Sequence, residues 1–247
     1  MLPSAALRTE YLKAFAEIVS RIQRSVSPGA ARTERSRGTK STPQHPAAMK
    51  AKGLPATKAE GLPATKAEGL PATKAEGLPI AMYVAGGAAQ LFYTGARVSE
   101  DIDASFSRRI LLPDNLEVAY ADADGTARML YLDRQYNETF ALLHEDVHDD
   151  SLPVKIEGVN PAIIDVRAFA PVDLAVSKIA RFADHDQDDI RALARAGLIM
   201  ADEVRERAEQ ALGNYVGNLA SVKTSIRLAC ELVRDNQAAR RARIRRG

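Results

Sequence analysis

The chain has 247 residues, and its 34 Lys and Arg against 32 Asp and Glu give a net charge of +2. This length suits one sizeable domain, and the near balance of charge excludes a global field that would hold nucleic acid or a membrane surface. A single cysteine, Cys230, excludes an internal disulfide, and no apolar run is long enough to span a bilayer. Because the N-terminus lacks the regions of a signal peptide, the sequence predicts a cytoplasmic protein without membrane contact.

The first predicted element is an amphipathic helix at residues 8–24. Four large apolar side chains recur there at three- and four-residue steps, which places them on one helical face: Tyr11, Phe15, Ile18 and Ile22. We interpret residues 1–24 as an N-terminal helix that packs this face on the core of the protein.

Residues 25–79 differ in composition and predict an insertion. Residues 25–52 are rich in Ser, Pro, Thr, Arg and Ala, and the unit GLPATKAE then occurs three times over residues 53–76. A proline in every unit rules out a continuous helix, and one leucine per unit is too little for a solenoid core. We expect a flexible low-complexity segment, with a tethered docking segment as the alternative.

A folded α+β domain is predicted over residues 80–200. Strand-like and helix-like stretches follow one another without a regular βαβ alternation, which favours a mixed sheet flanked by helices. In chain order these are a strand at 80–86, a helix at 87–95, a strand at 101–106, a hairpin at 117–133, a helix at 137–150, strands at 153–158 and 162–169, and a helix, acidic loop and helix at 170–199. Residues 201–247 form a C-terminal helical segment that ends in a basic tail.

Asp101 and Asp103 lie one residue apart in the stretch YVAGGAAQLFYTGARVSEDIDASF, residues 83–106. Residues two apart in a strand point to the same face, with Cα atoms about 7 Å apart, so both carboxylates project together. Two such carboxylates repel each other unless a cation lies between them, and a hard, oxygen-binding ion such as Mg²⁺ can bind both. A second ion about 4 Å from the first would complete a two-metal phosphoryl-transfer site.

Gly86 and Gly87 supply the second half of this pattern. Glycines after a strand let the backbone approach a ligand closely, and the N-terminus of the following helix offers free N–H groups to phosphate oxygens. Either half is common in proteins. Together, in this order, a phosphate cradle and a carboxylate pair indicate a site for a nucleoside triphosphate (NTP).

The stretch resembles the signature of the polymerase-β-type nucleotidyltransferase superfamily, in which Gly-Gly or Gly-Ser precedes Asp-hydrophobic-Asp. It is most similar to small bacterial members of toxin–antitoxin and abortive-infection systems, which read Arg-x-Thr before the aspartates where this chain has Arg97 and Ser99. A second similarity lies downstream in Asp173, Leu174, Lys178, Arg181 and the stretch DQDDI. The resemblance covers residues 80–200 and makes residues 25–79 an insertion between the first helix and the first strand.

The resemblance implies a nucleotidyltransferase core that binds an NTP and two Mg²⁺ ions. The implied metal ligands are Asp101, Asp103 and a third carboxylate, for which Asp165 is the candidate. The implied nucleotide-binding residues are Gly86, Gly87, Ala88, Arg97, Ser99 and Arg181. Many members carry a serine where this chain has Gly87, so no hydroxyl is available to the phosphate here.

Several assignments have alternatives. Asp165 follows an apolar pair in its predicted strand, but Glu157 competes for the same role, and Asp165 is nearly as well explained as a solvated strand residue. Lys178, a predicted catalytic residue, faces the triphosphate and offsets its charge, or else forms a surface salt bridge with Asp173. The acidic stretch after Arg181 begins a helix, with orientation of the two basic residues as the alternative.

Other residues are assigned no role. His144 and His148 have the spacing of a zinc pair, but no third ligand accompanies them, and we interpret a solvated helix face. Cys230 lies among apolar residues and is expected in the core. The arginine-rich tail could hold RNA through its phosphates, although the interleaved aromatic residues typical of base stacking are absent there.

The leading hypothesis is a metal-dependent nucleotidyltransferase that transfers a nucleoside monophosphate (NMP) to an acceptor hydroxyl. The acceptor is an RNA end or a protein side chain, and the protein acts as a toxin with a cognate antitoxin. One alternative is a non-catalytic binding or antitoxin-like subunit, against which the intact aspartate pair argues, since a dead site has no reason to keep two carboxylates that repel each other. A second is a small-molecule transferase, such as one that modifies an antibiotic.

Overall fold

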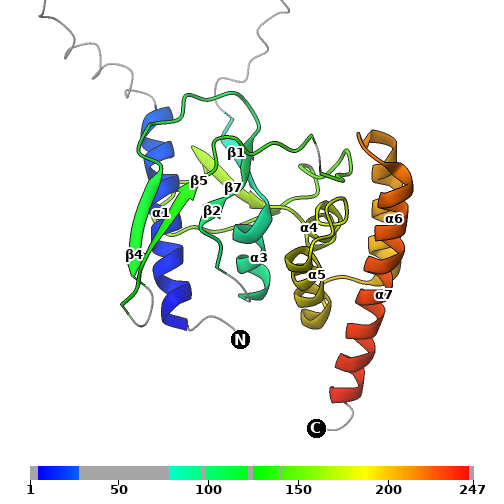
Figure 1. The fold of residues 1–247 in the computed structure, drawn as a ribbon. Coiled ribbons are helices and arrows are strands. Elements are labelled where there is room, and N and C mark those ends of the chain that lie inside the picture. Colours follow the sequence, from blue (N-terminus) through cyan, green and yellow to red (C-terminus); the bar gives the residue numbers. More distant parts are fainter. Residues whose placement is uncertain (1–4, 28–77, 96–97, 122–124, 140, 245–247) are drawn as a thin grey trace, which may run out of the picture. The chain divides into compact units, whose positions relative to one another are not determined.

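The computed structural model describes residues 5–27, 78–95, 98–121, 125–139 and 141–244, so nearly all of the predicted insertion lies outside the described residues. The helices are α1 (Ala5–Val26), α3 (Gly86–Thr94), α4 (Pro171–Ser177), α5 (Asp184–Ala196), α6 (Ala201–Ala211) and α7 (Leu219–Ile244), with a short 3₁₀ helix at Leu212–Asn214 (Figure 1). The strands are β1 (Ile80–Val84), β2 (Asp101–Ile102), β3 (Ala104–Phe106), β4 (Glu117–Ala121), β5 (Ala127–Leu132), β6 (Leu152–Pro153) and β7 (Ile164–Ala168).

The strands form two sheets that meet at one short segment. The first sheet has the order β3-β1-β7-β6, with β1 parallel to β7 and antiparallel to β3. The second has the order β2-β5-β4, with β2 parallel to β5. The predicted strand at 101–106 contributes to both sheets, because β2 ends at Ile102 and β3 begins at Ala104. Asp103 therefore lies at the junction, and the mixed sheets with their helices confirm the α+β class.

Helix α1 packs against β4 and β5 through the face that the sequence predicts (Figure 1). Its four apolar side chains are fully buried: Tyr11, Phe15, Ile18 and Ile22. Tyr11 meets Tyr120 of β4 edge to face with ring centroids 6.1 Å apart, and Phe15 meets Phe92 of α3 at 5.3 Å. Burial of each such side chain contributes roughly 1.5–3 kcal/mol, so α1 is an integral part of the core.

The helices near the aspartate motif and in the C-terminal part also follow the predicted pattern. Helix α3 ends at Gly95, whose φ of 59° permits its N–H to bond the carbonyl of Leu91 at 3.0 Å. The two predicted helices are α4 and α5, but the acidic residues expected in a loop form the first turns of α5, whose N-cap is Ala183. The C-terminal helices are α6 and α7. Within the described ranges, no helix is long and apolar enough to cross a membrane.

Two predicted elements are wrong. Residues 137–139 and 141–150 form turns and bends instead of a helix, because side chains compete for backbone donors: Asn137 accepts the N–H of Thr139 at 2.7 Å, and His144 accepts that of Asp146 at 3.1 Å. The strand expected at 153–158 is reduced to β6, and the chain turns away at Gly158, whose φ is +77°.

Candidate functional site

Gly86 begins α3 and touches Asp103. Its φ of +58° lies in the left-handed region that favours glycine. A Cβ at this position would lie 1.9 Å from Oδ2 of Asp103, so a larger residue would have to displace the carboxylate. The backbones are joined as well, since the N–H of Ala85 donates to the carbonyl of Asp103 at 2.9 Å. Direct contact with the second aspartate thus explains the first glycine of the pair.

Ser99 orients the other aspartate of the motif. The Ser99 side chain is buried, and its hydroxyl donates to Oδ1 of Asp101. The sequence placed Ser99 at the nucleotide. In the structure the hydroxyl is directed at the carboxylate and restricts its rotation, which makes Ser99 a support for Asp101.

Asp133 is a third carboxylate near the pair, and sequence reasoning missed it. It directly follows β5, and its N–H donates to the carbonyl of Ile102 in β2 at 3.0 Å. The parallel pairing of β2 with β5 therefore carries Asp133 to the aspartate motif. A carboxylate at the end of the predicted hairpin was the available signal, but the sequence does not say which strand β5 joins.

Charge accumulates around Asp103. Burial raises the pKa of Asp103 to about 6, and repulsion by Asp101 and Asp133 adds to that effect. Lys178 and Arg181 act in the opposite direction and only partly offset it. A cation bound among these carboxylates would favour the ionised form.

The donor set suits Mg²⁺ when a substrate shares the coordination. No group of three His, Cys, Asp or Glu side chains in the described part of the chain could hold a metal ion by itself. Mg²⁺ is normally bound by one or two carboxylates, with substrate phosphates and water as the remaining ligands. Asp101 and Asp103 fit that arrangement as an oxygen-donor pair.

A cleft of about 340 Å³ joins the two sequence motifs. Its walls come from the start of α3, the aspartate segment, the loop after β5 and the end of α4: Ala85, Gly86, Asp103, Tyr136, Ala141, Ser177, Lys178, Ala180 and Arg181. Larger pockets lie elsewhere: two grooves of about 530 and 540 Å³ share residues 155–157, one of them with Asp165 in its lining, and a pocket of about 430 Å³ lies at His144 and Gln210. None of these three contains the glycine pair, Asp101, Asp103, Lys178 or Arg181. We place the site in the smaller cleft because that is where the glycine, the carboxylate and the two cations meet.

The acidic stretch after Arg181 holds both cations of the cleft. Nζ of Lys178 lies 3.2 Å from Oδ2 of Asp189 and 3.8 Å from Oδ1 of Asp186. Arg181 donates twice to Asp186, at 2.8 and 2.7 Å. Asp186 also accepts the N–H of Ala183 at the start of α5, so the stretch both begins the helix and orients the basic residues.

Asp173 does not pair with Lys178. It is buried and bonds Arg207 of α6 at 2.7 and 2.9 Å. This pair fastens α6 to α4, which leaves Lys178 to the cleft. The surface salt bridge considered for Lys178 is therefore wrong.

The sheet register does not bring Asp165 to the aspartate pair. Asp165 is the Cα partner of Ala81 on β1, whereas Asp103 bonds Ala85 at the other end of that strand. Four residues of strand span about 13 Å, and β1 also separates β7 from β3. The Asp165 carboxylate instead pairs with Arg167 at 3.2 Å, so the third carboxylate beside the pair is Asp133.

The other residues predicted from the sequence divide into three groups. Gly87 and Ala88 lie buried in the first turn of α3, next to the cleft residue Gly86. Arg97 lies outside the described residues. Glu157 is exposed and lines the two larger grooves, away from the motif.

His148 is not on a solvated helix face. Its ring packs on Tyr83 with centroids 4.3 Å apart, and Nε2 lies 3.2 Å from the Glu138 carboxylate, which also accepts the Ser105 hydroxyl at 2.6 Å. The bond to Glu138 raises the pKa of His148. This cluster fastens the segment after β5, which includes the cleft residue Tyr136, to the first sheet.

Comparison with known proteins gives one match. The model of the family described as "Nucleotidyltransferase of unknown function (DUF6036)" matches residues 72–227, more than half of the chain. No curated protein and no solved structure matches. The matched region contains the glycine pair, all three carboxylates and both cleft cations.

We predict that Asp103→Asn stabilises the metal-free protein in a pH-dependent way. The folded state raises the pKa of Asp103 from 3.8 to about 6, so it binds more protons than the unfolded state between these values. The parent therefore loses stability as the pH rises through about 6, and the asparagine variant does not. In EDTA at pH 8 the variant should melt about 2–4 °C higher, the effect of roughly 1 kcal/mol in a chain of this size, and the difference should shrink towards pH 4. An equal difference at both pH values would contradict this origin.

We predict that Gly86→Ala removes Mg²⁺-dependent NTP binding, whereas Gly158→Ala does not. Both glycines have positive φ, so both substitutions carry the backbone cost of about 1–2 kcal/mol. Only the Cβ at position 86 meets Asp103, since nothing lies within 4 Å of one at position 158. Thermal melts with and without Mg²⁺ and NTP separate the shared cost from the lost binding. Equal NTP-induced shifts in the two variants would contradict the contact argument.

Proposed function

The chain belongs to the family of nucleotidyltransferases of unknown function, and on that premise we propose that it transfers NMP from an NTP to an acceptor hydroxyl. The observation that carries this proposal is the cleft in which Gly86, Asp103, Lys178 and Arg181 meet. Two of these residues come from the start of the family match and two from its downstream part. A helix start, a carboxylate and two cations are the groups that a metal-bound triphosphate requires.

The charged residues in and beside the cleft have distinct roles in this reaction. Asp101 and Asp103 would hold Mg²⁺, which supplies positive charge at the triphosphate oxygens. Lys178 and Arg181 bind the β and γ phosphates and stabilise the charge that develops on the pyrophosphate as it leaves. The acceptor oxygen forms a bond to the α phosphorus, and the bond from that phosphorus to the bridging oxygen of pyrophosphate breaks.

Asp133 is assigned to the acceptor. It lies beside the aspartate pair but outside the residues that line the cleft. A carboxylate at that position accepts the proton of the attacking hydroxyl, either directly or through a water molecule. An RNA end and a protein side chain both offer such a hydroxyl. The further role as a toxin with a cognate antitoxin rests on the sequence resemblance alone.

The non-catalytic alternative is less well supported. A subunit that only binds another protein gains nothing from three neighbouring carboxylates, one of them with its pKa raised to about 6. Such an arrangement costs folding stability and has a use only when a cation and a substrate occupy the site.

We predict that Asp133→Asn abolishes transfer and that Asp165→Asn does not. Incubation of each variant with α-labelled NTPs, Mg²⁺ and total cell RNA or protein measures the label that reaches an acceptor. Loss of a general base lowers the rate by about 10²–10⁴-fold, so the Asp133 variant should fall to background. The Asp165 variant makes the same substitution in the first sheet, where Asp165 pairs with Arg167 away from the aspartate pair, and it is the matched control. Full activity of the Asp133 variant would overturn its assignment, and no labelling by the parent would overturn the proposed function.

We predict that Lys178→Met lowers both stability and transfer, and that adding Asp189→Asn restores only stability. Lys178 is 9% exposed and Asp189 is 4% exposed, so the single variant removes a buried cation that lies 3.2 Å from the Asp189 carboxylate. Breaking such a pair costs about 3–5 kcal/mol, much of which the neutral asparagine avoids. Melting curves and transfer rates of both variants test this. Recovery of transfer in the double variant would show that Lys178 acts only on folding.

A further inference from the structure

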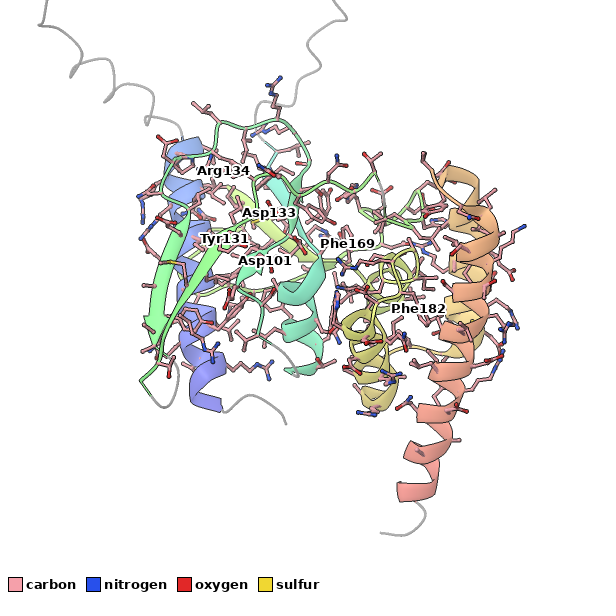
Figure 2. The ribbon with its side chains drawn as sticks, in the orientation of Figure 1. Asp101, Tyr131, Asp133, Arg134, Phe169 and Phe182 are labelled. Carbon is pink, nitrogen blue, oxygen red and sulfur yellow. The ribbon has the colours of Figure 1, made fainter. Side chains whose placement is uncertain are left out.

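Part of the cleft wall is a segment that has neither helix nor strand structure. The described residues between β5 and β6, 133–139 and 141–151, form turns, bends and irregular chain, and they contribute Tyr136 and Ala141 to the lining. The segment begins at Asp133, which bonds the carbonyl of Ile102 and lies close to Asp101 in Figure 2. Because no ladder of backbone hydrogen bonds holds such a segment, its position depends on the side chains that fasten it.

Glu138 and His148 fasten this segment to the first sheet. The Glu138 carboxylate accepts the hydroxyl of Ser105 in β3 at 2.6 Å and lies 3.2 Å from Nε2 of His148. The His148 ring packs on Tyr83 of β1 with centroids 4.3 Å apart. It also lies 5.9 Å from the ring of Phe169, which is found between β7 and α4 (Figure 2). Three neighbouring parts of the first sheet thus hold the segment in place.

Tyr136, two residues before Glu138, brings a hydroxyl to the cleft. Ser177 is the other lining residue with a hydroxyl, and it donates to the carbonyl of Leu174 at 2.8 Å. The Tyr136 hydroxyl has no hydrogen-bond partner among the described residues. Burial raises the pKa of Tyr136, and the charges of Glu138 and Asp103 add to the effect. The phenol therefore keeps its proton at neutral pH and is available as a hydrogen-bond donor.

The start of α3 offers no side-chain donor of this kind. Residues 86–89 read Gly-Gly-Ala-Ala, so a phosphate finds only backbone N–H groups there. Lys178 and Arg181 supply positive charge, part of which the carboxylates of α5 offset. Tyr136 shares the lining with these cations and with Asp103, where metal-bound phosphates would lie. The group nearest to this hydroxyl in a loaded cleft is therefore a phosphate.

We propose that the Tyr136 hydroxyl donates a hydrogen bond to the triphosphate of the bound NTP, and that Glu138 and His148 are positioning residues that hold it there. This inference rests on the proposed function and adds a substrate contact to the same site. Hydrogen bonds to charged acceptors are the stronger class, and loss of one lowers affinity by about 10- to 100-fold.

The test of the contact removes a single oxygen. Calorimetric titration in Mg²⁺ compares inorganic tripolyphosphate with each of the four common NTPs, on Tyr136→Phe and on Tyr215→Phe. Tyr215 is the matched control, since it lies between the 3₁₀ helix and α7 and outside the cleft lining. Tyr136→Phe should weaken tripolyphosphate and the preferred NTP by similar factors of about 10 to 100, whereas Tyr215→Phe should bind both as the parent does.

The positioning role is tested with two substitutions of His148. His148→Phe keeps a ring against Tyr83 and loses the bond to Glu138, whereas His148→Gln keeps a donor for Glu138 and loses the ring. His148→Phe should weaken tripolyphosphate binding in the parent but have no further effect in Tyr136→Phe, because the two residues act through one hydroxyl. His148→Gln should retain most of the affinity. Melting curves of each variant report separately on folding.

Four results would count against the inference, and they differ from one another. Parent-like binding of tripolyphosphate by Tyr136→Phe would remove the phosphate contact. Weaker binding of the NTP alone would assign the hydroxyl to the nucleoside and leave the proposed function standing. The same loss from His148→Phe with and without the Tyr136 hydroxyl would make the cluster purely structural. No Mg²⁺-dependent binding of any probe by the parent would remove the proposed function as well.

Discussion

The contact between Asp103 and Gly86 is the constraint on which the site depends. Asp103 is the one residue between β2, which ends at Ile102, and β3, which begins at Ala104. Its side chain therefore follows neither strand and lines the cleft. The turn into α3 must pass within contact distance of that carboxylate, which only a residue without a Cβ permits. The start of α3 and the Asp103 carboxylate are thereby fixed relative to each other by backbone geometry.

A charge network anchored by two buried carboxylates holds the other wall of the cleft. Lys178 and Arg181 follow α4 closely, and the carboxylates that hold them, Asp186 and Asp189, lie in the first turns of α5. Phe182, between these groups, has a φ of 49°, a conformation that costs a bulky residue free energy. The short connection accepts that strain because it places the cations and their carboxylates within bonding distance. The pairing holds the two cations in place and offsets part of their charge.

The sequence predicts those parts of the site that are local in the chain. The glycine pair, the two aspartates and the helix between them lie within one short stretch, and periodicity is enough to place them. Asp133 could not be found in this way, because its position follows from the pairing of β5 with β2, which is a contact between distant segments. Asp165 looked equivalent, since it also lies in an apolar strand, but only the register shows that it lies at the wrong end of β7. The residues around His148 failed as a helix for a different reason, as their polar side chains satisfy the backbone locally.

The two sides of the carboxylate group differ in charge, because different elements of the fold lie on each side. Helices α4 and α5 supply the Asp103 side with two cations that are held by buried acids, which suits a highly charged leaving group. The β4–β5 hairpin supplies the Asp101 side with the exposed ring of Tyr131, which lies between Glu117 and Asp101 of the neighbouring strands. A substrate with negative charge on both sides would bind poorly on the Asp101 side. Because carboxylates flank that side, the arrangement favours a donor that brings the phosphates and an acceptor that adds little negative charge.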